Sequence, residues 1–137
     1  MRPEAGLLLA ALSPSLFAQA PGPVPQQPAP VAPAPAPDVW VPRPVIEIAV
    51  LDKVSARATA LSGKVGQELH LGSLTIVAKS CMVRPPGAAP DAAAYLEITD
   101  GRPGTAPFHG WMLLRSPAVS VYEHPVYDVR LIGCRAA

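Results

Sequence analysis

From Trp40 onward, apolar and polar residues alternate along the chain with a period of two. In the segment SLTIVAKSCMV, residues 73–83, Leu74 and Ile76 fall on one face while Lys79 falls on the other. Successive side chains of a β-strand point to opposite faces, so this pattern predicts a strand with one buried face. No window of a dozen residues shows an apolar stripe at helical spacing that is free of Gly, Pro or β-branched residues. The alternation therefore predicts an all-β fold.

Similar patterns predict six further strands, over residues 45–50, 54–61, 67–71, 94–98, 108–114 and 126–134. Turn-forming residues separate the segments: Ser62-Gly63, Gly72-Ser73, Pro85-Pro86-Gly87, Asp100-Gly101 and Ser116-Pro117. About seven short strands with turns at this spacing are typical of a single compact antiparallel β-sandwich or barrel. We expect this domain to cover residues 38–137.

Residues 21–37 form a linker of a different kind, because eight of the seventeen are proline. Proline fixes φ and donates no backbone hydrogen bond, so this stretch is expected to be an extended, disordered tail outside any sheet. An inert spacer is the favoured interpretation. The alternative is a ligand for a proline-binding groove, although no Arg or Lys flanks a PxxP frame here.

The N-terminal residues predict export. Arg2 precedes an apolar run at residues 5–12, and an A-x-A site follows at residues 18–20. These are the parts of a secretory signal peptide, expected over residues 1–20, and they predict a periplasmic protein. The apolar run is shorter than the roughly 20 residues that span a bilayer, so we expect no integral membrane protein, and no lipoprotein cysteine follows it. A retained N-terminal helix is the alternative, because Pro21 would lie just after the cleaved bond.

Charge excludes two classes of partner. Lys and Arg together number 11, Asp and Glu number 10, and the net charge is +1. Nucleic-acid binding calls for a basic stripe, and binding to anionic membranes calls for a polybasic segment. Neither is present in the sequence.

Cys81 and Cys134 are the two cysteines of the chain. In an exported domain an even number of cysteines predicts a disulfide, here worth about 4 kcal/mol for the long loop that it closes. A redox pair or two metal ligands are the alternatives, and the CxxC spacing that would favour them is missing. The period places both cysteines opposite the more apolar face of their strands. We therefore expect the two strands to be neighbours, joined by the disulfide on their outer side.

The residues that could carry chemistry are few. His124 and Asp128 are four apart, which along a strand separates them by about 13 Å, so they are poor candidates for a shared zinc site. His70 and His109 belong to other segments. We assign no catalytic residue, metal or cofactor. The alternative is a small periplasmic hydrolase or carbohydrate-acting module with its site near Glu123, His124 and Asp128.

Aromatic residues offer candidate binding contacts. Trp111 and Tyr127 are expected mainly to fill the core, with stacking on a sugar or anchoring of a protein partner as the alternative. The stretch containing Tyr122, Glu123 and His124 is interpreted as a turn before the last strand, with Tyr122 and His124 as its exposed contacts. These five residues form the candidate binding set.

Four motifs in order, "LDK", "C-x-x-RPP", "GWM" and "EHPVYDV-x-x-x-x-C", together with the stretches around them, resemble an exported proteobacterial family catalogued as domain of unknown function 2155. The resemblance covers Trp40 to Cys134. It implies a periplasmic domain with a signal peptide, one disulfide and no assigned activity. It carries over no catalytic residue.

Together, the export signal, the proline-rich spacer and the near-neutral charge favour a non-enzymatic binding or assembly accessory in cell-envelope maintenance. Its expected partner is an envelope protein, or a lipid or glycan component. Besides the hydrolase, a third interpretation is an inhibitor that presents a strand edge to an envelope enzyme.

Overall fold

The chain divides into two units, Met1–Pro33 and Ala34–Ala137. A computed structural model describes residues 6, 10–23, 25–34 and 39–137. The described residues of the first unit are exposed and form no helix or strand. No helix in the described ranges has the length and hydropathy to span a membrane. Residues 1–5 and 7–9 of the predicted signal peptide, residues 24 and 35–37 of the proline-rich linker and residue 38 of the predicted domain lie outside the described residues.

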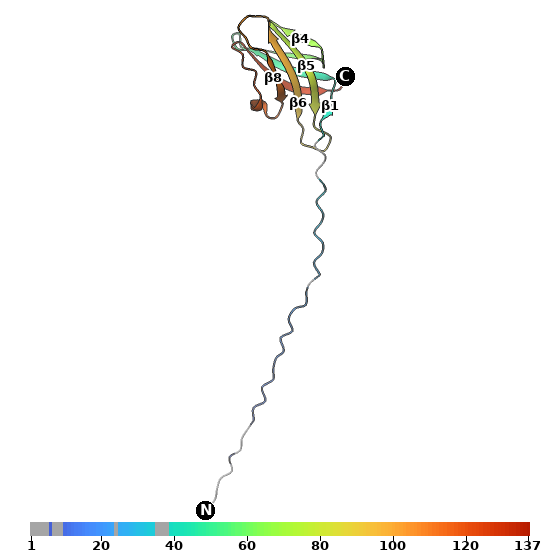
Figure 1. The fold of residues 1–137 in the computed structure, drawn as a ribbon. Coiled ribbons are helices and arrows are strands. Elements are labelled where there is room, and N and C mark those ends of the chain that lie inside the picture. The colour runs from blue at the N-terminus through green and yellow to red at the C-terminus, as the bar shows by residue number, and fades with distance from the viewer. Residues whose placement is uncertain (1–5, 7–9, 24, 35–38) are drawn as a thin grey trace, which may run out of the picture. The chain divides into compact units, whose positions relative to one another are not determined.

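The described part of the second unit contains eight strands and one short 3₁₀ helix (Figure 1). In chain order they are β1 (Val41–Pro42), β2 (Val45–Asp52), β3 (Arg57–Lys64), β4 (Glu68–Leu71), β5 (Leu74–Val83), β6 (Ala92–Asp100), β7 (Phe108–Leu113), η1 (Pro117–Val119) and β8 (Tyr127–Arg135).

These strands form two separate antiparallel sheets. Sheet A has the order β1-β5-β6-β7, with β4 also paired to β5, and sheet B has the order β3-β2-β8. The predicted all-β fold is therefore confirmed, and of the two expected architectures it is the sandwich, because the sheets do not close into a barrel.

The core lies between the two sheets and follows from the period-two pattern. Every second residue of β2, β5 and β6 is buried over most of the strand length, and its apolar side chain packs against the opposite sheet. Each such side chain contributes about 1.5–3 kcal/mol on leaving water. The largest fully buried members are Ile46, Ile48, Val50, Leu74, Ile76, Leu96 and Ile98.

One predicted turn is wrong. Ser62 and Gly63 lie inside β3, and the turn falls later, at Gly66, whose φ is +87°. Gly63 belongs in the strand because β3 passes very close to β4 here. A Cβ atom at Gly63 would lie 2.5 Å from the Cδ2 atom of Leu69. The glycine therefore permits close packing, whereas the left-handed backbone at Gly66 turns the chain.

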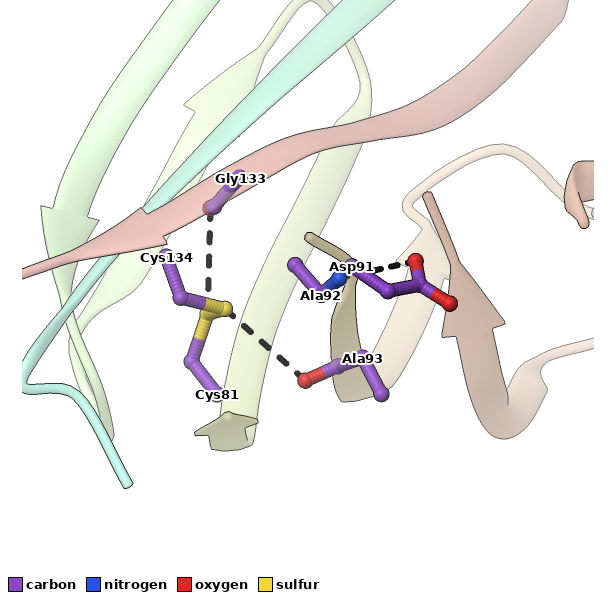
Figure 2. The surroundings of a disulfide bond; sticks show 6 residues. All are labelled: Cys81, Asp91, Ala92, Ala93, Gly133 and Cys134. Carbon is purple, nitrogen blue, oxygen red and sulfur yellow. Dashed lines mark hydrogen bonds between the residues drawn. A yellow bond between two sulfur atoms is a disulfide. The ribbon is translucent and has the colours of Figure 1, made fainter. Parts of the chain in front are cut away.

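The predicted position of the disulfide is also wrong. Cys81 lies on β5 of sheet A and Cys134 on β8 of sheet B, so the bond joins the two sheets rather than neighbouring strands (Figure 2). The Cα atoms are 5.7 Å apart. Cys81 is 1% exposed and belongs to the core, not to the outer side.

A β-bulge in each strand explains this difference. In β5 the pairing with β6 shifts between Ala78 and Ser80, which leaves Lys79 as an extra residue. In β8 the pairing with β2 passes from Leu131 to Gly133, which leaves Ile132 extra. One extra residue reverses which face all later side chains occupy. Both cysteines follow their bulges, and both therefore turn inward.

Candidate functional site

His124 holds the segment before β8 against the core. Its side chain is 2% exposed, and its Nε2 atom lies 2.7 Å from Oδ2 of Asp100, at the end of β6. The Nδ1 atom accepts hydrogen bonds from the backbone N–H groups of Val126 and Tyr127, at 3.1 and 3.0 Å. Because Nδ1 accepts, the ring proton resides on Nε2 and is donated to Asp100. The imidazole thus closes a link between the last strand and β6.

Asp100 is the anionic partner in this link. Its side chain is 1% exposed, and its Oδ1 atom accepts the backbone N–H of Arg102 at 2.9 Å. Hydrogen bonds from the Ser73 hydroxyl, the Arg102 N–H and the His124 imidazole hold the pKa of Asp100 at about 2, below its usual 3.8. The carboxylate is therefore kept ionised and fully occupied by partners from the protein.

Aromatic rings surround the imidazole. The Tyr122 ring stacks on His124 with centroids 5.3 Å apart, and Tyr127 lies at the same distance with a tilt of 32°. Phe108 contacts Tyr122 edge to face at 5.8 Å. Among the described residues, the Tyr122 hydroxyl is buried without a hydrogen-bond partner. Burial and the charge of Asp100 raise the pKa of this phenol, so it remains protonated.

The expected exposure of Tyr122 and His124 is therefore wrong: Tyr122 is 3% exposed and His124 6% as a whole residue. Tyr127 is buried in the core, as predicted, at 8%. Tyr122 and His124 are buried because the segment before β8 packs against the end of β6, where His124 contacts Asp100. That contact joins residues 24 positions apart in sequence.

The residues of the hydrolase alternative do not assemble into an acid–base group. Glu123 is exposed, and Asp128 accepts a hydrogen bond at 3.0 Å from Arg130. An open hollow is lined in part by Glu123, Asp128 and Lys53, whose Nζ atom donates to the His124 carbonyl at 2.5 Å. Both ring nitrogens of His124 are already engaged within the protein. As placed, its imidazole has no free nitrogen to offer a substrate in this hollow.

The other two histidines lie on sheet A and are exposed. His70 on β4 contacts Thr75 and Glu68, and His109 on β7 lies 3.8 Å from Glu97. Within the described ranges, no three His, Cys, Asp or Glu side chains gather where they could hold a metal ion.

The outer face of sheet A carries an apolar hollow. It is lined by Trp40, Met82, Ala93, Trp111 and Leu113. The hollow follows from strand register, because Met82 pairs with Ala93 and Ala93 pairs with Leu113 across β5, β6 and β7. Side chains directly opposite on neighbouring strands share one face of the sheet.

Trp111 is the exposed anchor of this hollow, at 42% exposure. The expectation that it fills the core is wrong, because its neighbour Met112 takes the inward position. The ring meets Tyr95 edge to face at 5.6 Å, and the guanidinium of Arg84 lies over Trp40 at 4.9 Å. Sequence reasoning missed Trp40 and Met82. Trp40 directly precedes the first strand, and a tryptophan at that position could have been listed as a candidate binding residue.

The buried Tyr122 hydroxyl gives a first testable prediction. Changing Tyr122 to phenylalanine removes a polar group that has no protein partner and keeps the ring contacts. We expect the free energy of unfolding to stay unchanged or to rise by about 1 kcal/mol. Changing Tyr122 to alanine removes the ring and should lower it by about 3 kcal/mol or more. Urea unfolding of the two variants and of the unchanged chain measures both differences. A loss of stability in the phenylalanine variant would show that the hydroxyl has a stabilising partner.

Comparison with known proteins agrees with the sequence resemblance. A model of the family DUF2155, described as an uncharacterized protein conserved in bacteria, matches residues 46–134. The uncharacterized protein RP359 of Rickettsia prowazekii (strain Madrid E) is 28% identical over 91 residues, which cover 64% of this chain and 59% of that protein. The chain thus spans about three fifths of the length of this relative. No solved structure matches.

Proposed function

The chain belongs to the DUF2155 family of uncharacterized bacterial proteins, and within that family we propose that it is an exported, non-enzymatic accessory that binds another protein of the cell envelope. The apolar hollow around Trp111 carries the binding part of this proposal. Export is supported by the signal-peptide pattern at residues 1–20. It is supported further by the Cys81–Cys134 bond, because such bonds persist in oxidising compartments such as the periplasm.

The chemistry of the hollow favours a protein partner. Apart from the indole N–H groups of Trp40 and Trp111, its lining side chains have no strong hydrogen-bonding group. A sugar needs such groups around a stacking ring, whereas an apolar side chain of a partner needs only the shape and the aromatic surface. Tryptophan is enriched among the residues that dominate binding energy, and a polar rim such as Arg84 is typical around them.

The test begins in cells that express the chain with its own N-terminus. The mass of the protein recovered from the periplasm should correspond to loss of residues 1–20. A photo-crosslinking amino acid at Met82, which is partly exposed in the hollow, should capture one protein. The same group at Ala60, an exposed position on β3 of the other sheet, should capture none.

The captured protein is then identified and prepared separately. It should bind the purified chain, and Trp111→Asp should weaken this binding at least about tenfold, since a central tryptophan is commonly worth more than 1.4 kcal/mol. Equal capture from Ala60, or binding that Trp111→Asp leaves unchanged, would contradict a role for the hollow. A glycan or lipid retained in a native mass spectrum would assign a different class of ligand.

A further inference from the structure

Strand β8 forms an open edge of sheet B. In the order β3-β2-β8 it pairs with β2 alone. Among the described residues, β8 makes no backbone–backbone hydrogen bond outside this pairing. An edge strand of this kind presents a row of N–H and C=O groups that a further strand can pair with.

A groove runs beside this open edge. Asp128–Leu131 of β8 and Met112 and Leu113 of β7 line this groove. The rest of its lining is Pro117, Ala118, Ser120 and Val121. Apolar side chains are exposed around it: Val119 is 72% exposed, Val121 55% and Ile132 43%. Sheet A extends to β7 on this side, whereas sheet B ends at β8. A strand added to β8 would therefore extend the shorter sheet and cover apolar surface.

The charges on β8 identify which strand fits. Asp128 and Arg130 both point to the outer face of sheet B, and between them Val129 points inward, where it is 3% exposed. In an antiparallel pair, charges directly opposite each other attract or repel across the strands. A complementary strand must therefore carry a basic residue opposite Asp128 and an acidic residue opposite Arg130, with an apolar residue between them.

This chain contains such a strand, and it is β8 itself. We propose that two copies of the chain associate edge to edge along β8, antiparallel, with Val129 facing Val129 on the two-fold axis. Asp128 of each copy then faces Arg130 of the other, and the two three-stranded sheets join into one continuous sheet of six. A two-fold interface of this kind is closed, so the assembly stops at a dimer.

The same charges select a single register. Sliding one strand by two residues keeps the apolar faces aligned but places Asp128 opposite Asp128, or Arg130 opposite Arg130. Sliding by one residue turns apolar side chains outward. The bulge at Ile132 ends the regular edge on the other side. Because the outward charges repel in the other registers, they allow this pairing and oppose indiscriminate growth of the sheet.

Dimer formation exchanges an existing contact for an equivalent one. Within one copy, Arg130 Nε donates to Asp128 Oδ2 at 3.0 Å, and the Arg130 side chain is 64% exposed. An exposed pair of this kind contributes little to the stability of the monomer. Both side chains are therefore available to re-pair across the interface. The groove beside β8 shares Leu113 with the apolar hollow on sheet A, but Asp128 and Arg130 do not line the hollow and Trp111 does not line the groove. Substitutions at these residues therefore test the two proposals separately.

The test measures the dissociation constant of the dimer by sedimentation of the full chain as recovered from expressing cells. The chain itself should dimerise as its concentration rises. Asp128→Arg leaves only positive charges at positions 128 and 130, and Arg130→Asp leaves only negative charges at these two positions. Each variant alone should dimerise at least about tenfold more weakly, because two like-charge pairs replace two attractive pairs. Mixing the two variants should restore a heterodimer.

A matched pair on sheet A controls for net charge. Lys79 and Glu97 lie 3.3 Å apart; Lys79 is exposed and Glu97 is partly exposed. Lys79→Glu and Glu97→Lys, alone or mixed, should leave the dissociation constant of the dimer unchanged, and thermal unfolding shows that every variant folds. A chain that stays monomeric at all concentrations overturns the proposal. So does a dimer that tolerates both β8 variants, since it must use another surface. Binding of an unrelated extended peptide at this edge without self-association would assign the groove to a different partner.

Discussion

Replacing Cys81 and Cys134 together by alanine is expected to lower the free energy of unfolding by about 4 kcal/mol. The bond joins residues 53 positions apart, and opening it releases a long loop in the unfolded chain. Alanine is the appropriate substitution because Cys81 is buried among apolar side chains, where a serine hydroxyl would need a partner. A native stability of about 5–15 kcal/mol makes this a large fraction of the total.

Guanidinium unfolding of the second unit, with and without a reducing agent, measures this effect. The reducing agent should destabilise the chain and have no effect on the double-alanine variant, which is the internal control. A difference below about 1 kcal/mol between the two proteins would mean that the bond does not constrain the unfolded chain as the loop-entropy argument requires.

Changing His124 to alanine, in the chain with its disulfide intact, is expected to lower the free energy of unfolding by about 3–5 kcal/mol. The substitution removes two ring contacts and leaves the backbone N–H groups of Val126 and Tyr127 without their acceptor. It also leaves the buried Asp100 carboxylate without its imidazole partner. Removing one member of a buried, hydrogen-bonded pair is strongly destabilising because the other member remains desolvated.

The matched control is His109→Ala, which changes an exposed histidine and should alter stability by no more than about 0.5 kcal/mol. The pH dependence gives a second readout. Because folding lowers the pKa of Asp100 from 3.8 to about 2, its contribution is fully present above pH 3.8 and is lost as the pH falls through about 2. Asp100→Asn should therefore make the melting temperature depend less steeply on pH over this acid range. Equal losses from His124→Ala and His109→Ala would contradict the structural role of His124.

The strands were predictable because their pattern is local. Each of the seven predicted segments overlaps a strand of the fold, since alternation along β2, β5 or β6 directly reflects one buried face. The segment predicted over residues 54–61 begins three residues before β3 begins and ends three residues before β3 ends. The remaining strand, β1, was not predicted because two residues are too few to show a period, and one of them is proline. The inner and outer faces were harder to assign. Trp111 and Met112 are adjacent and both apolar, so the sequence could not indicate which one the second sheet covers.

The position of the disulfide and the burial of His124 depend on features that local patterns do not record. The side chains of Lys79 and Ile132 do not mark them as the extra residues of bulges, yet each reverses the face of every later residue in its strand. The His124 site depends on Asp100, which meets it only after β7 and the following loop have folded back. Sequence reasoning singled out His124 as an exposed contact and misjudged its surroundings, because those surroundings come from a long-range contact.

The shortness of β1 has a mechanical consequence. Force applied to the chain ahead of Trp40 first loads the contacts of Trp40 in the apolar hollow and the pairing of Val41 and Pro42 with β5. It also loads one bond of 2.8 Å from the Arg43 N–H to the Cys81 carbonyl. These contacts should give way at low force. The load then reaches β2, which is held between β3 and β8, while the covalent Cys81–Cys134 bond ties β8 to the opposite sheet. Under tension, a few residues at the N-terminal end of the domain should therefore detach and extend at low force. The core should unfold only at a higher force.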